Sequence, residues 1–323
     1  MKTGTVMRRM IGSMAGDLSP MKRQLAAILD QSKTLTNSKL VSLSGLTNEE
    51  IEFLAQSWRG TGLRRRREII SELVRLSEAD LKLNFCPIFV MSLGDPDEQI
   101  RAEAASGLEG EDNYLLINPL LKALREDVSS KVRAAVAKTL GRFALQAELG
   151  NLPSHYQEKV YNSLLEVLHK SDEPIDVRRR VLEAISPFSR PEVKDLIKAA
   201  YRTDDIRMKA SAIFAMGRNC AVAWLPTLLL ELNNDQAEIR YEAAGALGEL
   251  GAEEAVPHLL DRAVDNDERV REAAIRALGE IGNEPAKQAL NTLAKSLEPT
   301  VRDAAESALK EIQFCEDPLY LPP

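Results

Sequence analysis

The residues whose types could support chemistry are few and scattered. The chain has three histidines and three cysteines: His155, His169 and His258, and Cys86, Cys220 and Cys315. No His-Glu dipeptide, HExxH motif or CxxC pair occurs, whereas zinc and iron sites need clustered ligands of these types. The chain also lacks a Walker A sequence, a nucleophile elbow and a dinucleotide-binding fingerprint. We therefore expect no metal, no cofactor and no enzymatic activity.

Arginine is the chemically capable residue that recurs at regular spacing. Arg240, Arg271 and Arg302 stand 31 residues apart in the similar phrases IRYEAAGALGELG, VREAAIRALGEIG and VRDAAESALKEI. Earlier copies are less faithful, and together eight arginines occupy this position: Arg66, Arg101, Arg133, Arg178, Arg207, Arg240, Arg271 and Arg302. The chain is thus built from an internal repeat.

Acidic or Asn residues precede most of these arginines by several positions. Examples are Asp95 before Arg101, Asp127 before Arg133, Asp235 before Arg240 and Asp267 before Arg271. A carboxylate in such a turn can accept hydrogen bonds from helix N–H groups and can also face the guanidinium of an adjacent repeat. We interpret these arginines as a structural ladder between repeats, in preference to a ligand site.

The repeat unit reads as a helical hairpin. Each arginine phrase follows a second apolar run, such as AVPHLLDRAVDND, and apolar residues such as Ile239, Ala243 and Leu247 fall on one helical stripe. Gly248 and Gly279 are expected to permit close helix approach, and Gly251 and Gly282 to end their helices. One hairpin cannot bury its apolar stripes alone, so the copies must stack. The prediction is an all-α, right-handed α-solenoid of about eight helical hairpins.

The organisation along the chain divides into three parts. Residues 1–46 are expected to form a partly disordered N-terminal extension with one helix beginning at Ser19 and Pro20, followed by a linker over 34–45. The repeat array covers 47–314 and opens with a Thr47–Glu50 capping box. Residues 315–323 form an extended tail. The stretch 145–159 is expected to lengthen a helix or to protrude as a loop.

The repeat phrase resembles a known family. Its pattern, D-x-x-x-[VI]-R-x-x-A-A-x-x-L-G-x-x-G followed by A-V-P-x-L-L, is similar to the short HEAT-like repeats first named from phycobilisome bilin lyase subunits. The resemblance covers roughly 47–314 and is strongest from residue 204 onward. Two departures are the 45-residue interval between Arg133 and Arg178, and Pro187 in place of the Ala-Leu-Gly helix end. Arrays of this family serve as scaffolds, adaptors and chromophore-lyase subunits.

This resemblance implies that the arginine-bearing helices line a concave surface, where solvent-facing side chains form a binding row. The candidate partner-binding residues at these positions are Tyr241, Glu249, Arg276, Glu280 and Glu311. Tyr and Arg are favoured interface anchors. Residues 201–323 hold 13 basic and 22 acidic residues, a net charge of −9, against 29 and 27, or +2, for residues 1–200. The acidic half is expected to attract a basic partner.

Three functions stay open at this point. The leading interpretation is a non-enzymatic scaffold or adaptor that binds a protein partner, a basic or amphipathic segment, along the concave face. An accessory subunit of a bilin lyase or another chromophore-handling system is the first alternative, suggested by the resemblance. Nucleic-acid binding, suggested by RRRR at 64–67, is the second, although the pI of about 5.3 argues against it.

The expected location is the cytoplasm. No apolar stretch reaches eighteen residues, the first residues lack the long apolar segment of a secretory signal, and the three cysteines are widely spaced. An odd number of unpaired thiols fits a reducing compartment. The sequence leaves the oligomeric state open.

Overall fold

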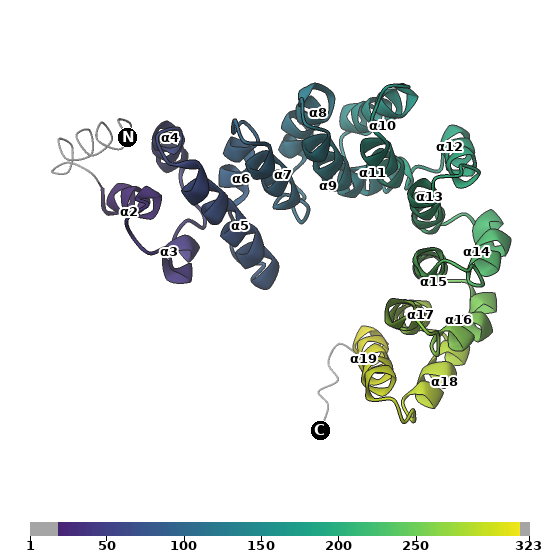
Figure 1. Cartoon of the computed structure of the whole chain (residues 1–323). Coiled ribbons are helices and arrows are strands. Elements are labelled where there is room, and N and C mark those ends of the chain that lie inside the picture. The colour runs from purple at the N-terminus through teal and green to yellow at the C-terminus, as the bar shows by residue number, and fades with distance from the viewer. Residues whose placement is uncertain (1–18, 317–323) are drawn as a thin grey trace. The chain divides into compact units, whose positions relative to one another are not determined.

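The computed structural model describes residues 19–316, and within this range the chain forms eighteen α-helices, three short 3-10 helices and no strand (Figure 1). None of the helices in this range is long and apolar enough to cross a membrane. The disorder and the extended tail expected at the two ends concern residues that lie largely outside the described range. Of the expected tail, Cys315 and Glu316 are described, and both belong to the last helix.

The chain divides into two compact units. The first runs to Phe143 and includes Ser154–Ser163, and the second comprises Ala144–Pro153 and the chain from Leu164 onward. Each unit is described by itself. The boundaries at residues 46 and 314 that the sequence suggests stay a prediction.

The first unit opens with two helices, α2 (Pro20–Leu29) and α3 (Asn37–Val41). The Ser19 hydroxyl accepts a hydrogen bond from the Lys22 N–H at 3.3 Å, so the predicted start of α2 is confirmed. The linker predicted over 34–45 is wrong in part, because α3 forms inside it and both Leu40 and Leu43 are buried. A helix as short as α3 is not stable on its own, so burial of these two leucines is what stabilises it.

Hairpins follow in sequence order. They are α4 (Asn48–Trp58) with α5 (Leu63–Ala79), α6 (Cys86–Ser92) with α7 (Glu98–Ser106), and α8 (Ile117–Glu126, after η1 Tyr114–Leu116) with α9 (Ser130–Glu148). The capping box is present, since the Thr47 N–H donates to the Glu50 carboxylate at 2.9 Å and the Glu50 N–H to the Thr47 hydroxyl at 3.4 Å. The 145–159 stretch lengthens α9 by a turn before five residues lead to α10.

Five further hairpins complete the array. They are α10 (Ser154–His169) with α11 (Ile175–Ile185), α12 (Pro191–Tyr201) with α13 (Ile206–Asn219), α14 (Leu225–Glu231, after η2 Val222–Trp224) with α15 (Ala237–Leu250), α16 (Val256–Arg262, after η3 Glu253–Ala255) with α17 (Glu268–Ile281), and α18 (Glu284–Leu293) with α19 (Pro299–Glu316). In the described range eight hairpins therefore carry the eight repeated arginines, each on its second helix. The predicted α-solenoid is confirmed.

Small residues set the packing of second helices in the second unit. We call α11, α13, α15, α17 and α19 the second-helix row, in which each helix packs against the next. A Cβ added to Gly217 would lie 2.6 Å from the Cα of Ala246, and one added to Gly248 would lie 2.8 Å from the Cα of Ala277. These clashes show that only glycine permits this helix separation. The expected role of Gly248 is confirmed.

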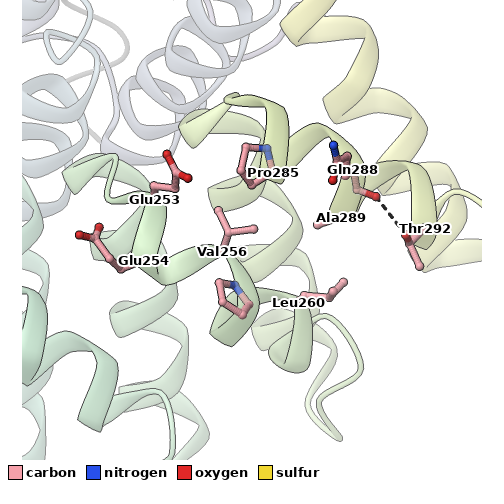
Figure 2. Close-up of a pocket in the computed structure, with 9 residues that line it drawn as sticks. Glu253, Glu254, Val256, Leu260, Pro285, Gln288, Ala289 and Thr292 are labelled. Carbon is pink, nitrogen blue, oxygen red and sulfur yellow. Dashed lines mark hydrogen bonds between the residues drawn. The ribbon is translucent and has the colours of Figure 1, made fainter.

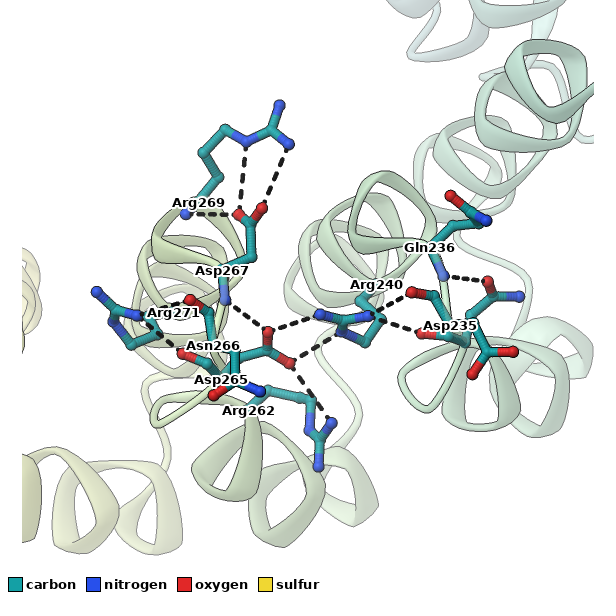
Figure 3. Close-up of polar contacts among 10 residues, drawn as sticks. Asp235, Gln236, Arg240, Arg262, Asp265, Asn266, Asp267, Arg269 and Arg271 are labelled. Atoms are coloured by element: carbon teal, nitrogen blue, oxygen red, sulfur yellow. Dashed lines mark hydrogen bonds and ion pairs between the residues drawn. The ribbon is translucent and has the colours of Figure 1, made fainter.

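The arginine ladder is visible in the second unit (Figure 3). Arg240 donates from Nε and Nη2 to both oxygens of Asp265, at 2.9 and 2.7 Å, and from Nη1 to the carbonyls of Asn234 and Asp235, at 2.8 and 3.1 Å. Its guanidinium therefore joins the turn of its own hairpin to the turn of the next one. Only 14% of the Arg240 side chain and 5% of the Asp265 side chain are exposed.

The same contact recurs in the first unit. Arg101 donates to both carboxylate oxygens of Asp127 at 2.7 and 2.8 Å, and Arg66 lies 3.1 Å from the Asp95 carboxylate. A planar guanidinium that holds a carboxylate through two parallel hydrogen bonds is a strong and directional contact. The structural interpretation of these arginines is therefore supported by their geometry.

The acceptor is a different turn residue from some of those that the sequence suggested. The acceptor stands six residues before the arginine of the next repeat, so Arg240 pairs with Asp265. Asp267 instead caps α17, where its carboxylate accepts a hydrogen bond from the Arg269 N–H at 3.0 Å. Asp235 contributes only its backbone carbonyl to Arg240. We expected one carboxylate both to cap the helix and to face the arginine of the adjacent repeat. In the structure Asp267 does the first and Asp265 does the second.

The ladder changes where this turn position is not acidic. Tyr201 stands at the position that would supply the acceptor for Arg178, and the Nε of Arg178 is buried without a hydrogen-bond partner. Asn234 stands at the position that would supply the acceptor for Arg207, and Arg207 lies 3.3 Å from the carboxylate of Asp176 instead. The carboxylate contact at this turn position is therefore absent at Arg178, at Arg207 and also at Arg271, where Ser296 takes the position.

Candidate functional site

The five predicted interface residues come from three consecutive members of the second-helix row. Tyr241 and Glu249 lie on α15, Arg276 and Glu280 on α17, and Glu311 on α19. Tyr241 is half-buried, whereas the four charged residues are exposed. The helices α15 and α17, and α17 and α19, pack directly against each other. Regular stacking of the repeat therefore brings side chains about 70 residues apart in sequence onto one surface.

Two adjoining hollows collect these residues. The first, which we call the acidic hollow, has a volume of about 200 Å³ and is lined by Phe214, Tyr241, Glu242, Gly245, Ala246, Glu249, Arg276 and Glu280. The second lies between α17 and α19, and Glu311 lines it together with Arg276 and Glu280. Arg276 and Glu280 are thus shared by both. Whether the five residues bind a partner stays a prediction.

The acidic hollow carries more negative than positive charge. Three carboxylates line it, those of Glu242, Glu249 and Glu280, against the single guanidinium of Arg276. Nε of Arg276 lies 3.6 Å from Glu280, and Arg218 lies 3.7 Å from Glu249. Although both side chains keep some exposure, partial desolvation in the hollow raises the pKa of Glu249 and of Glu280, and these guanidiniums only partly oppose the shift. The carboxylates are therefore incompletely compensated.

Glu242 is the most perturbed of the three. Burial, and then the neighbouring charge of Glu183, raise its pKa to about 7, while Arg180 and Arg179 oppose this shift. Both guanidiniums have other partners, since Arg180 lies 2.6 Å from Glu183 and Arg179 donates to the Ser211 hydroxyl at 3.0 Å. Glu242 itself is half-buried. Near neutral pH its carboxyl is therefore only partly ionised.

The sequence did not single out Glu242 or Phe214. Helical periodicity places Glu242 on the polar side of α15, where a solvated carboxylate is the ordinary expectation. Side chains of earlier repeats surround it, because charged residues of α11 act on its carboxylate and Phe214 of α13 lines the same hollow. The nearest signal in the sequence is its position directly after Tyr241.

The basic run at 64–67 is largely committed to structure. Arg65 is only 4% exposed and donates to the carbonyls of Asp30, at 3.0 Å, and Lys33. Arg66 pairs with Asp95, and Arg67 holds Asp97 through two hydrogen bonds of 3.0 and 2.6 Å. Arg65 therefore ties α5 to the segment after α2, and its side chain is not available to a nucleic-acid backbone.

Possible metal ligands are dispersed as well. Across residues 19–316, no group of three or more His, Cys, Asp or Glu side chains could hold a metal ion. His155, His169 and His258 are all exposed. The three cysteines are free thiols.

A further groove lies on the first helices of the second unit (Figure 2). Its walls are Val256, Pro257 and Leu260 beside Pro285 and Ala289, so it is mainly apolar. The side chains of Glu253, Glu254, Gln288 and Thr292 complete its lining. It contains no residue of the second-helix row, and no sequence pattern predicted it.

Comparisons with known proteins agree with this architecture. No curated protein sequence matches the chain. The complex of CpcE and CpcF of phycocyanin lyase from Nostoc sp. PCC7120 is similar over 85% of this chain and 97% of that chain, with 16% identity and a TM-score of 0.56. Yeast importin-beta (Kap95p) is similar over 95% of this chain and 46% of that chain, with 14% identity and a TM-score of 0.52.

These two likenesses show the fold alone. Human deoxyhypusine hydroxylase aligns over 94% of this chain and 99% of that chain at 19% identity, but its TM-score of 0.35 carries no argument. The family model for HEAT repeats matches residues 87–175 and 225–310, together more than half of the chain. The chain therefore belongs to the HEAT-repeat family.

Proposed function

We propose that the protein is a non-enzymatic scaffold that binds a basic segment of a protein partner along α15, α17 and α19. The observation that supports this most directly is the gathering of Tyr241, Glu249, Arg276, Glu280 and Glu311 around two adjoining hollows. The proposal includes a cytoplasmic location, which free cysteines suit.

Charge and residue type both favour such a partner. The second unit contains most of the strongly acidic part of the chain, and an acidic surface accelerates the encounter with a basic segment. Tyr241 and Arg276 are of the types that anchor interfaces. No specific observation favours bilin handling, because fold likeness at 16% identity does not transfer an activity. That alternative stays a prediction.

The test is capture of partners by the purified chain with three substitutions, Glu249→Lys, Glu280→Lys and Glu311→Lys. Crosslinking followed by mass spectrometry would compare it with the wild type, and we expect most specific partners to be lost. A matched control carries Asp195→Lys, Asp204→Lys and Asp261→Lys, three exposed acidic residues that line neither of the two hollows nor the groove of Figure 2. Both variants change the net charge equally, so a difference in partner capture between them would come from the local surface.

Unfolding midpoints of both variants establish that each is folded. Unchanged capture by the first variant would contradict the proposed surface. Equal losses in both variants would show that overall charge, and not this surface, recruits the partner.

A further inference from the structure

The acidic hollow has the dimensions of a receptor for one side chain. At about 200 Å³ it is smaller than the 300–1,000 Å³ that is usual for small-molecule sites. Gly245 lies in its lining, and a Cβ there would meet only the Arg276 guanidinium, at 3.7 Å. The absence of a side chain at Gly245 therefore keeps this hollow open, in contrast to Gly248, which faces the backbone of α17.

Its lining combines carboxylates with aromatic rings. Glu242, Glu249 and Glu280 supply negative charge, and Phe214 and Tyr241 supply apolar surface. A long cationic side chain gains from both, through charge-assisted hydrogen bonds at its charged end and through apolar contact of its stem with the rings. An anion would meet three carboxylates, and an apolar group would desolvate these carboxylates further without adding a partner for them.

We propose that the acidic hollow receives one arginine or lysine side chain, with its charged end among Glu242, Glu249 and Glu280 and its stem against Phe214 and Tyr241. This inference rests on the proposed function and names the group of the partner that enters the surface. The occupant is a single cationic side chain of a basic segment. Charge complementarity is the reason for this choice.

The surrounding groups make this contact depend on pH. Glu242 faces Glu183, Arg179 and Arg180 from α11, and Glu238 on its own helix. Glu249 faces Arg218 from α13, and Arg276 and Glu280 face the hollow from α17. The tight pairs of Arg180 with Glu183 and of Arg179 with Ser211 leave Glu242 to be neutralised by a proton or by the incoming cation.

Proton and cation therefore compete for Glu242. Because its pKa lies at about 7, only about a tenth of the molecules carry the ionised form at pH 6, whereas most carry it at pH 8. Binding of a cationic side chain should accordingly be about tenfold tighter at pH 8 than at pH 6. Binding is tighter at higher pH because the cation binds the ionised form of Glu242, so any proton on Glu242 must be released.

The experiment titrates the ¹⁵N-labelled full chain with N-acetyl-arginine amide and follows the backbone amides of Gly245 and Ala246 by NMR. N-acetyl-citrulline amide, a neutral analogue of nearly the same shape, is the matched control ligand. We expect saturable shifts with the arginine probe, no saturation with the citrulline probe, and about tenfold weaker binding at pH 6. Glu242→Gln should remove most of this pH dependence.

Two variants at one position test the place of binding. Gly245→Leu fills the hollow without changing any charge and should abolish the shifts, whereas Gly245→Ala should retain them. Equal shifts with both probes, or an unchanged affinity in Gly245→Leu, would overturn the inference.

The two proposals can fail separately. Partner capture that is lost in the triple lysine variant, with no binding of the arginine probe, would leave the surface standing and remove the inference about the hollow. Probe binding at Gly245 with unchanged partner capture would instead keep the cation site and remove the scaffold surface.

Discussion

Replacement of Arg240 by Met is the sharpest test of the ladder. The change keeps the aliphatic stem but removes four hydrogen bonds, two to the Asp265 carboxylate and two to turn carbonyls. Asp265 then stays buried, with Arg262 at 3.5 Å as its remaining cationic neighbour. Removal of one partner from a buried ion pair costs about 3–5 kcal/mol. Because Arg262 compensates in part, we expect a loss of about 2–4 kcal/mol.

Such a loss should be visible as a lower unfolding midpoint. For a unit of this size, each kcal/mol corresponds to about 2–4 °C, so the midpoint should fall by about 4–16 °C. Urea unfolding followed by circular dichroism gives the free energy, and hydrogen exchange at the start of α17 shows whether the loss is local. Arg207→Met is the matched control, because Arg207 holds the same repeat position but is 46% exposed and lacks the bidentate contact. It should cost less than about 1 kcal/mol.

The pH dependence follows from the same contact. Burial raises the pKa of Asp265, but the hydrogen bonds and charge of Arg240 outweigh it, with help from the Asp267 N–H, so the pKa lies below its ordinary value. A depressed carboxyl pKa contributes stability above about pH 4 that is lost as the pH falls through the folded-state value. The difference between wild type and Arg240→Met should therefore shrink in acid. Equal midpoints for Arg240→Met and Arg207→Met at pH 7 would refute the ladder.

Three further predictions concern single residues of the second unit. Glu242→Gln should add at most about 3 kcal/mol to the free energy of unfolding above pH 7, because the folded state raises this pKa from 4.5 to about 7; the gain should vanish below about pH 4.5 in urea titrations. Gly248→Ala should cost about 1–3 kcal/mol in thermal unfolding, because its Cβ would lie 2.8 Å from the backbone of α17, whereas Gly245→Ala should be neutral or stabilising. Lys209→Met should destabilise by about 2 kcal/mol, since Lys209 lies 2.8 Å from the buried Glu231 carboxylate; an unchanged urea midpoint would contradict this.

The sequence by itself determined the repeating elements of this protein. The spacing of Arg240 and its counterparts, the apolar stripe around Ile239, and the glycines at 251 and 282 were enough to predict helical hairpins and their ends. Gly251 and Gly282 end α15 and α17 with φ values of +66° and +60°, as expected. These features are local, because periodicity and caps depend on residues within a few turns of each other. Copying the unit then predicts that the second helices of successive hairpins share one surface, as α15, α17 and α19 do.

Only the tertiary structure decided which side chains meet between repeats. Arg240 pairs with Asp265 and not with Asp267, and Arg65 is buried against the segment after α2. Glu242 is half-buried and lies within reach of the charges of α11. In each case the partner comes from another hairpin, so the contact depends on the distance and rotation between stacked helices. The periodicity of the sequence predicts which face of its own helix a side chain lies on. It does not state how close the neighbouring helix lies, and that separation determines burial, charge compensation and the pKa values of the site.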